Sequence, residues 1–273
     1  MRCWALLLPV FHRWSGRALV MTGLALVLVA PFGGKALFAA LGWEPHSSLY
    51  AFSDGVAQAM GVDPAPEQVL AWMQREDLRG WAAWAATGPW YSWGLRLEFW
   101  RIPKVLGIML IGMAAGRRLA AGTLLADRRL LWRVLVAGLV VGVPASAIYA
   151  WRPGLGQVHW PSLIGTMPLG LAYAAAFALA WPVARRWLGI FAAPGRMALT
   201  NYSTHSLVGL VVFFGIGFGL AGRIPVWAFY AVVGAIFALQ IVASKWWLAR
   251  HAQGPMEALW RRWTYGPMAR TGT

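Results

Sequence analysis

Six long apolar stretches constrain the fold of this chain more than any other feature of its sequence. A helix that crosses the hydrocarbon core of a bilayer needs about 20 consecutive, mostly apolar residues. Stretches of this kind run over residues 18–40, 97–116, 134–151, 160–182, 198–221 and 225–246. Of the 273 residues only 12% are charged, against roughly 25% in soluble domains. The sequence therefore predicts an all-α, polytopic integral membrane helical bundle with about six transmembrane helices.

The net charge of +15 comes from Lys and Arg residues that are shared unevenly between the connections. Alternate connections hold fifteen of them on one side of the membrane and five on the other. Because Lys and Arg accumulate in cytoplasmic loops, both termini are predicted to be cytoplasmic and residues 41–96 to lie outside. A nucleic-acid partner would need these residues clustered on one polar face, so the expected partner is the lipid bilayer and no nucleic acid.

Three observations argue against common classes of soluble enzyme and metal protein. The single cysteine, Cys3, excludes an internal disulfide framework and a cysteine-based zinc site. The five histidines are scattered over both predicted sides, so no metal site and no cofactor are expected. The chain lacks a phosphate-binding glycine loop and the HExxH and GxSxG motifs. Its glycine-rich run, residues 215–222, falls inside a predicted span and is not a dinucleotide fingerprint.

The pattern divides the chain into three parts. Residues 1–17 form an N-terminal partial helix and basic turn, residues 18–96 the first transmembrane helix and an outer Trp-rich segment, and residues 97–273 a membrane domain with a cytoplasmic tail. The apolar residues 3–12 are too few to span a bilayer. They are either the end of a helix whose beginning is absent, in an N-terminally truncated protein, or a short interfacial segment.

The outer segment contains a helix signal of its own. Asp63, Pro64 and Pro66 precede an apolar pattern at helical spacing, and six tryptophans then crowd the approach to the second span. Indole rings favour the border between water and lipid. The segment therefore either lies along the outer interface as an anchor or covers a cavity as a lid.

Ionisable residues inside a membrane are costly and mark candidate functional sites. Glu98, Arg101 and Lys104 recur at a spacing of three, which places them on one face of a helix. Either Lys104 extends outward to the interface, or these residues face an internal cavity. In the second case, a cationic outer vestibule would suit an anionic or phosphate-bearing solute.

A second polar cluster opens the fifth apolar stretch at its cytoplasmic end. Asn201 and His205 share one helix face, and Tyr202 and Ser206 share the next. Because histidine titrates near neutrality, His205 is the candidate for catalytic proton transfer. The alternative is that these side chains are structural and form hydrogen bonds between helices.

The tail after the sixth stretch predicts a further helix that begins at Pro255. Glu257 and Arg261 have the i, i+4 spacing of an ion pair, and neighbouring Trp and Arg residues suit an interface with anionic headgroups. The helix is either a cytoplasmic anchor or a closure of the inner end of the bundle, in which Glu257 reaches Arg196.

Small residues four positions apart recur in three stretches: Gly112 with Gly116, Gly138 with Gly142, and Gly215 with Gly219. Such pairs let helix backbones approach closely in lipid. They favour packing against a neighbouring helix of the same chain, with a homo- or hetero-oligomer as the alternative.

Three runs in the second half of the chain resemble the YeiB-like family of bacterial inner-membrane proteins: GRMALTNYSTHS (195–206), SKWWLARHAQGPMEALWRRWTYG (244–266) and LIGMAAGR (110–117). The resemblance is to the C-terminal domain of unknown function of that family and covers about residues 97–268. It implies a multi-helix fold in the bacterial inner (plasma) membrane, a suspected transport role and a distant grouping with membrane acyltransferases. Members of the family usually begin upstream, with several more helices.

Three functional hypotheses follow. The first is transport-type handling of a small or lipid-linked anionic solute, and the second is an acyltransferase-like membrane enzyme in which His205 is the base. The third is a truncated, non-catalytic membrane subunit. The candidate binding residues are Glu98, Arg101, Lys104, Arg196, Asn201, Tyr202, His205, Ser206 and Glu257.

Overall fold

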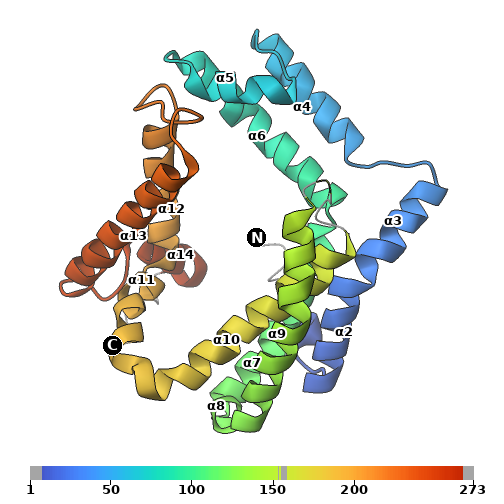
Figure 1. Cartoon of the computed structure of the whole chain (residues 1–273), viewed down its shortest axis with the longest axis vertical. Helices are drawn as coiled ribbons and strands as arrows, with labels where there is room; N and C mark the ends of the chain where they lie inside the picture. Colours follow the sequence, from blue (N-terminus) through green and yellow to red (C-terminus); the bar gives the residue numbers. More distant parts are fainter. Residues whose placement is uncertain (1–7, 153, 155–158, 267–273) are drawn as a thin grey trace. The chain divides into compact units, whose positions relative to one another are not determined.

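The structure of the chain is a computed structural model that describes residues 8–152, 154 and 159–266 (Figure 1). Every regular element in these residues is a helix, so the all-α class predicted from the sequence is confirmed. The chain forms two compact units: Met1–Phe52 with Pro89–Pro182 (unit 1), and Ser53–Gly88 with Val183–Thr273 (unit 2).

Within the described residues, three segments are long and apolar enough to cross a membrane: Arg128–Trp151, Trp160–Arg196 and Val226–Leu248. Two further pairs qualify if each is one bent span: Gly16–Leu28 with Ala30–Ala40, bent by 45°, and Leu78–Glu98 with Arg101–Ala120, bent by 71°. The structure thus has three to five candidate spans, where the sequence predicted about six.

The fifth apolar stretch, residues 198–221, is not one continuous helix. Helix α12 (Ala198–Phe213) has 16 residues, fewer than the roughly 20 that a span needs. Glycine is poorly suited to a helix interior, and both Gly219 and Gly222 have the positive φ of a turn. Residues 215–222 therefore form a turn and do not continue the helix that the apolar stretch predicted.

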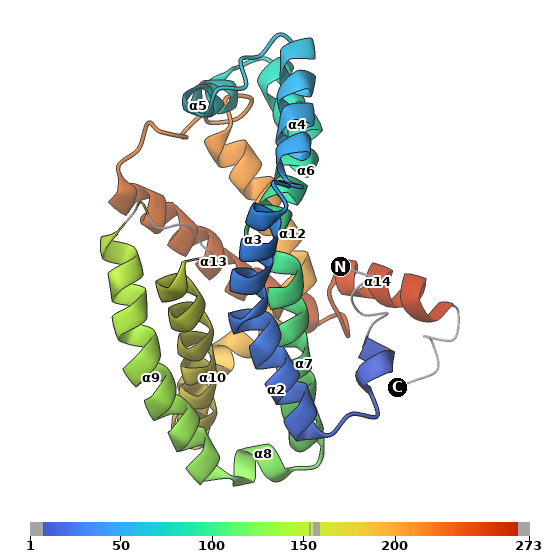
Figure 2. The same cartoon turned by 90° about the vertical axis from the view of Figure 1, so that its right-hand side faces the viewer.

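Unit 1 is built around two pairs of packed helices. Its elements are η1 (Leu8–Phe11), α2 (Gly16–Leu28), α3 (Ala30–Ala40), α7 (Arg101–Ala120), α8 (Thr123–Ala126) and α9 (Arg128–Trp151), with parts of α4 (Ser47–Ala59), α6 (Leu78–Glu98) and α10 (Trp160–Leu188). Helices α2 and α7 lie side by side (Figure 2). Leu19 and Leu110 are completely buried between them. Gly23 and Gly107 allow this close approach, because a Cβ on either would overlap the carbonyl oxygen of the other.

Helices α9 and α10 form the second pair, and their contact also depends on glycine. A Cβ at Gly138 or Gly142 would collide with the α10 backbone, so the predicted packing of this pair against a neighbouring helix is confirmed. The analogous pair on α7, Gly112 and Gly116, has no atom within 4 Å of an added Cβ. On α7 the glycine that makes the contact is Gly107, which the spacing rule did not select.

The N-terminal turn is held by Arg117 at the end of α7. Its guanidinium donates hydrogen bonds to the backbone carbonyls of His12 and Trp14, each at 2.6 Å. Ser15 then begins α2 by accepting a hydrogen bond from the Ala18 amide at 3.2 Å. Of the predicted partial helix over residues 3–12, the structure describes residues 8–12, and η1 covers Leu8–Phe11 of these.

Unit 2 contains residues 53–88, the middle part of the predicted Trp-rich segment, together with the C-terminal helices. Its further elements are η2 (Pro66–Gln68), α5 (Val69–Gln74), η3 (Gly189–Phe191), α11 (Ala192–Arg196), α12, α13 (Val226–Leu248) and α14 (Pro255–Tyr265). The segment has a small core of its own, formed by Ala57, Val62, Trp72 and Ala83. This core explains how helices in a connection between spans remain folded.

The turn after α12 is tied to α5 of the same unit. The Gly215 amide donates a hydrogen bond to the Met73 carbonyl at 2.7 Å, and the Gln74 amide group donates to the Ala221 carbonyl at 2.8 Å. A Cβ at Gly215 would overlap the backbone carbonyl oxygens of Gln74 and Arg75 at the end of α5. The glycine-rich run thus allows the turn after α12 to pack closely against the backbone of α5 in the Trp-rich segment.

Candidate functional site

The first predicted cluster lies in unit 1, at the junction between α6 and α7. Trp100 has φ 51° and ψ 35°, in the left-handed region, so α6 ends at Glu98 and α7 begins at Arg101. The prediction that Glu98, Arg101 and Lys104 share one helix face is therefore wrong, because the helix breaks between the first and second of them. A left-handed residue other than glycine costs about 1–2 kcal/mol, so packing must hold the break.

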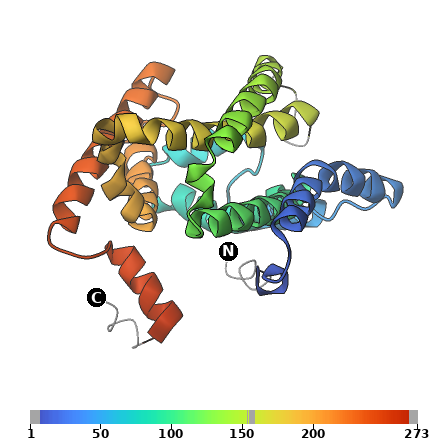
Figure 3. The ribbon, with the colours of Figure 1, turned by 90° about the horizontal axis from the view of Figure 1, so that it is seen from below.

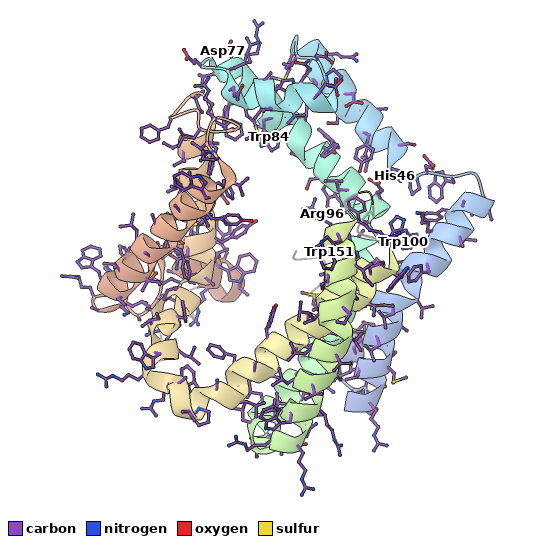
Figure 4. All side chains as sticks on the ribbon, in the orientation of Figure 1. His46, Asp77, Trp84, Arg96, Trp100 and Trp151 are labelled. Carbon is purple, nitrogen blue, oxygen red and sulfur yellow. The ribbon has the colours of Figure 1, made fainter. Side chains whose placement is uncertain are left out.

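The Trp100 indole supplies that packing. Its ring lies directly against the Gly34 backbone of α3, where any Cβ would overlap it, and it packs on the Phe38 ring with centroids 5.2 Å apart. An aromatic ring that docks into a helix surface buries a large apolar area. The break thus fixes the end of α3 beside the end of α6 (Figure 4, where Trp100 is labelled).

Glu98 is held by a partner from another helix. The Tyr50 hydroxyl of α4 donates a hydrogen bond of 2.5 Å to the Glu98 carboxylate, and the Tyr50 ring lies against Gly94. Burial of the Tyr50 phenol, this hydrogen bond and the negative charge of Glu98 together raise the pKa of Tyr50. The phenol therefore remains a donor, and the pair fixes one oxygen of the Glu98 carboxylate.

A cavity of about 320 Å³ opens beside this pair within unit 1. It lies where the connection after α3, the α6–α7 junction and the start of α10 meet, and His46 and Trp100 on its wall are labelled in Figure 4. Its lining combines aromatic and ionisable side chains: Phe38, Trp43, Phe99 and Trp100 with Lys35, Glu44, His46, Glu98 and His159. A pocket of this size and mixed character suits a small polar ligand.

The two predicted cations lie next to this cavity but do not line it. Arg101 is half-buried at the start of α7, and its positive charge opposes the rise in the pKa of Tyr50. Lys104 is half-buried one turn further along the helix. Among the described residues, none forms a hydrogen bond or ion pair with the Lys104 ammonium group.

The second predicted cluster lies in unit 2, where Glu257 joins α14 to the start of α12. Its carboxylate accepts hydrogen bonds from the Leu199 amide at 2.7 Å, the Thr200 amide at 3.1 Å and the Thr200 hydroxyl at 2.5 Å. The first amides of a helix have no partner within it. Glu257 therefore caps α12 from a different helix.

Thr200 returns the contact by capping α14. Its hydroxyl oxygen accepts a hydrogen bond from the Met256 amide at 3.1 Å. A Cβ at Gly254 would overlap both the Thr200 hydroxyl and the Glu257 carboxylate, so only glycine fits before Pro255. We call this arrangement of Glu257, Thr200, Met256 and Gly254 the reciprocal cap.

Arg196 reaches the same connection by another route. Its guanidinium donates a hydrogen bond to the Ala252 carbonyl at 3.0 Å, while the Glu257 carboxylate is occupied by α12. Among the described residues, Glu257 forms no ion pair with Arg261, which the i, i+4 spacing predicted, and none with Arg196, which the closure alternative required. Glu257 thus does not reach Arg196, as the closure alternative required, and it joins α14 to the start of α12 by helix capping.

Asn201 is structural in this unit. Its side-chain amide donates to the Ser244 hydroxyl at 3.0 Å and to the Pro194 carbonyl at 3.2 Å, and its backbone carbonyl accepts from the Gln240 side-chain amide at 2.9 Å. Gln240 and Ser244 are both buried on α13. They were missed from the sequence, although two polar residues four apart in an apolar span are a recognisable signal.

The other three predicted residues of this cluster diverge along α12. Tyr202 is 72% exposed, and the Ser206 hydroxyl donates to the Tyr202 carbonyl at 3.1 Å. His205 is half-buried, and no described residue forms a hydrogen bond with its ring. Among the described residues, therefore, no carboxylate is placed to orient this imidazole as a base.

Ser206 also lines an apolar groove of about 740 Å³ within unit 2. The groove follows α12 away from the reciprocal cap towards the turn after Phe213 and the start of α13. Its wall includes Leu210, Phe213, Leu220 and Phe229. No group of three or more His, Cys, Asp or Glu side chains that could hold a metal ion occurs in the part of the chain that the structure describes.

Among the described residues, fold and sites together define an all-helical protein with three to five candidate membrane spans. Residues 115–267, more than half of the chain, match the family described as Protein of unknown function (DUF418), and the chain belongs to this family. The match includes both runs that form the reciprocal cap and confirms the resemblance to YeiB-like proteins. No solved structure gave a significant match.

Three uncharacterised proteins are similar to this chain. YxaH of Bacillus subtilis (strain 168) is 33% identical over 58% of the chain, and YeiB of Escherichia coli (strain K12) is 32% identical over 66% of it. An uncharacterised 39.9 kDa protein in the amylase 3' region of Bacillus acidopullulyticus is 35% identical over 41% of the chain. The matched regions span 39%, 46% and 33% of these relatives, less than half of each.

Proposed function

We propose that the chain is a multi-pass protein of the bacterial inner membrane that carries out transport-type handling of a small or lipid-linked anionic solute. The observation that carries the proposal is the cavity of unit 1, which adjoins the cationic start of α7. Lys35 lines it, and Arg101 and Lys104 follow its wall residue Trp100. Cations close to a partly enclosed pocket concentrate anionic ligands.

The remaining wall fits the rest of such a solute. Trp43 and Trp100 offer apolar faces for a ring or a lipid chain, and His46 and His159 offer further polar contacts. One oxygen of the Glu98 carboxylate accepts a hydrogen bond from the Tyr50 hydroxyl, and the other can accept hydrogen bonds from donor groups of the solute. The favoured ligand therefore carries an anionic group, hydrogen-bond donors and an apolar portion.

The placement of charges in unit 1 supports a topology with both termini in the cytoplasm. Arg117 binds the N-terminal turn, and Arg118 pairs with Asp127 at 3.0 Å before α9. These arginines gather at one end of the α2–α7 pair, and the cavity lies at the other end. Since the positive-inside rule places the arginine-rich end in the cytoplasm, the cavity faces outward in the proposed orientation.

A six-span arrangement remains part of the proposal. It counts α2 with α3, then α7, α9, α10, α12 and α13. Helix α12 rises about 24 Å at 1.5 Å per residue, so the turn that follows it must complete the crossing.

Transport also needs a moving part, and the units divide beside Pro89 in α6 and Pro182 in α10. Proline removes a backbone hydrogen bond from a helix and is a favoured place for bending.

The experiment uses the three lysines of the chain. Full-length protein in lipid nanodiscs is titrated with phosphate-bearing and carboxylate-bearing solutes, with neutral analogues beside them, and the thermal unfolding midpoint is recorded. An anionic solute is expected to raise the midpoint, and Lys35→Gln and Lys104→Gln to reduce that rise. Lys245→Gln, on the last turn of α13, is the matched control. The proposal fails if anionic and neutral solutes raise the unfolding midpoint equally. It also fails if Lys245→Gln reduces the rise as much as Lys35→Gln and Lys104→Gln do.

An acyltransferase-like enzyme is the alternative, and the groove of unit 2 is the observation that favours it. The groove is apolar, it reaches Ser206, and His205 is the preceding residue on α12. The chain of an acyl donor, a thioester or an ester, would lie along Leu210 and Phe213. His205 would take the proton of an acceptor hydroxyl, whose oxygen bonds to the acyl carbonyl carbon while the bond to the donor's thiol or alcohol breaks, and that group leaves with the proton. Transfer of a labelled acyl chain in nanodiscs tests this role, and activity that survives His205→Ala rejects it.

A further inference from the structure

Helix α14 carries an apolar stripe that remains partly exposed. Met256, Leu259, Trp260 and Trp263 follow the i, i+3, i+4, i+7 pattern of one helix face, and they are 37%, 39%, 45% and 67% exposed. Arg261 and Arg262 are exposed beside the stripe. A helix with apolar and aromatic residues on one face and basic residues beside it is typical of binding to a membrane surface.

The connection to α13 keeps this stripe close to the bilayer. Residues 249–254 separate the candidate span α13 from α14, and six residues reach at most about 20 Å when fully extended. The connection is pinned at two points, because Trp247 donates to the Gln253 carbonyl and Arg196 to the Ala252 carbonyl, each at 3.0 Å. Figure 3 shows α14 (red) leaving α13 through this short connection.

Charge determines which lipid surface fits. Lys245, Arg250, Arg261 and Arg262 are the basic residues of this region, and Glu257 is its acid. The reciprocal cap engages Glu257, so its carboxylate is turned away from the arginines and towards α12. Anionic headgroups attract such a basic segment, and each Lys or Arg near the surface strengthens binding severalfold.

The reciprocal cap then connects lipid binding to a second helix. Glu257 lies on α14 between the two ends of the apolar stripe, and its carboxylate holds the Leu199 and Thr200 amides that begin α12. Thr200 in turn holds the start of α14. If the start of α12 or of α14 moves, the start of the other helix must therefore move with it, or the hydrogen bonds of the reciprocal cap must break.

We propose that α14 is a lipid-binding helix for the anionic surface of the bilayer that α13 crosses, and that the reciprocal cap couples its binding to the start of α12. The Met256–Trp263 stripe binds to a bilayer that contains anionic lipid. This binding holds α14 and its Glu257 in position, and Glu257 then orders residues 199–201. Without anionic lipid, α14 is held less firmly and the start of α12 opens more often.

The test measures backbone hydrogen exchange of the full chain in nanodiscs of phosphatidylcholine alone or mixed with phosphatidylglycerol. Exchange reports local opening of helix ends. We expect exchange at residues 199–201 and in α14 to be about tenfold slower with phosphatidylglycerol, and exchange in α9 to be unchanged. Arg261→Gln with Arg262→Gln should remove the difference. Arg185→Gln with Arg186→Gln, a matched exposed pair at the end of α10, should retain it.

Two variants separate the lipid-binding part from the coupling part. In Glu257→Ala, phosphatidylglycerol should still slow exchange in α14 but should no longer slow it at residues 199–201. Glu257→Gln keeps an acceptor oxygen and should retain part of the response at residues 199–201. Equal exchange of the wild-type protein in both lipids overturns the proposal. An equal loss of the response in the Arg185 and Arg186 control overturns it as well, because the effect would then be general charge attraction.

Discussion

Among single residues, Glu257 has the most demanding position, because one carboxylate serves a helix to which it does not belong. Burial of this carboxylate opposes its ionisation, but the hydrogen bonds from the Thr200 hydroxyl and from backbone amides outweigh that effect and lower the pKa of Glu257. A carboxyl group with a lowered pKa in the folded state stabilises the fold above its unfolded pKa. That stabilisation is lost as the pH falls through the folded pKa.

The first prediction concerns this carboxylate. Glu257→Ala leaves two amides and a hydroxyl without their acceptor, and loss of a helix cap costs about 1–2 kcal/mol. Glu257→Gln should cost less, because one acceptor oxygen remains. The thermal unfolding midpoint, followed from about pH 7 to about pH 4, should fall more steeply for the wild type than for Glu257→Gln. Parallel curves for the two proteins would contradict the proposed role of the charge.

A second prediction uses two adjacent glycines of α3. Gly34 faces the Trp100 indole without room for a Cβ, whereas Gly33 has no atom within 4 Å of one. Gly34→Ala should therefore displace Trp100 and lower the unfolding midpoint. Gly33→Ala should be neutral or stabilising by up to about 1 kcal/mol. The same loss for both variants would mean that helix propensity rather than the Trp100 contact decides the outcome.

At the scale of helices, apolar periodicity predicted most elements but could not locate breaks that depend on tertiary contacts. The left-handed Trp100 had no local signal, because its cause is Gly34, more than sixty residues earlier in the chain. The end of α12 did have one, since four glycines lie within residues 215–222. The spacing of Gly215 and Gly219 predicts helix packing, but the low helix propensity of the four glycines is the stronger effect.

The contact between α2 and α7 gives a prediction at the same scale. Gly107→Leu should separate the two helices and expose Leu19 and Leu110, so the unfolding midpoint should drop by several degrees. Gly112→Leu lies on the same helix, where an added Cβ meets open space, and should have little effect. If Gly112→Leu destabilises as strongly, a partner outside the described chain covers that face of α7.

For the whole molecule, the sequence predicted the helical class and the polar regions but not which residues in them would meet. Thr200 and Glu257 are 57 positions apart, and both lie in runs that the resemblance had singled out. Composition marked these runs as polar or interfacial. The capping geometry that joins them depends on Gly254, whose importance appears only when both helix ends are in place.

Membrane orientation is the prediction that belongs to the whole chain. With Cys3→Ser as background, single cysteines are introduced at Gly61 and Arg223 on the predicted outside, and at Gly122 and His251 on the predicted inside. A membrane-impermeant maleimide applied to intact cells should label the first two and spare the others. All four should react after the membrane is opened, which controls for burial of the thiol.

Each pattern of labelling has a distinct consequence for the fold. Labelling at Gly122 in intact cells would mean that unit 1 has the opposite orientation and that its cavity faces the cytoplasm. That result would contradict the orientation inferred from the arginines that gather beside Arg117. Labelling at Gly61 but not at Arg223 would mean that α12 and the turn after it do not cross. In that case the short α12 is a re-entrant helix, and the reciprocal cap anchors it from the inner surface.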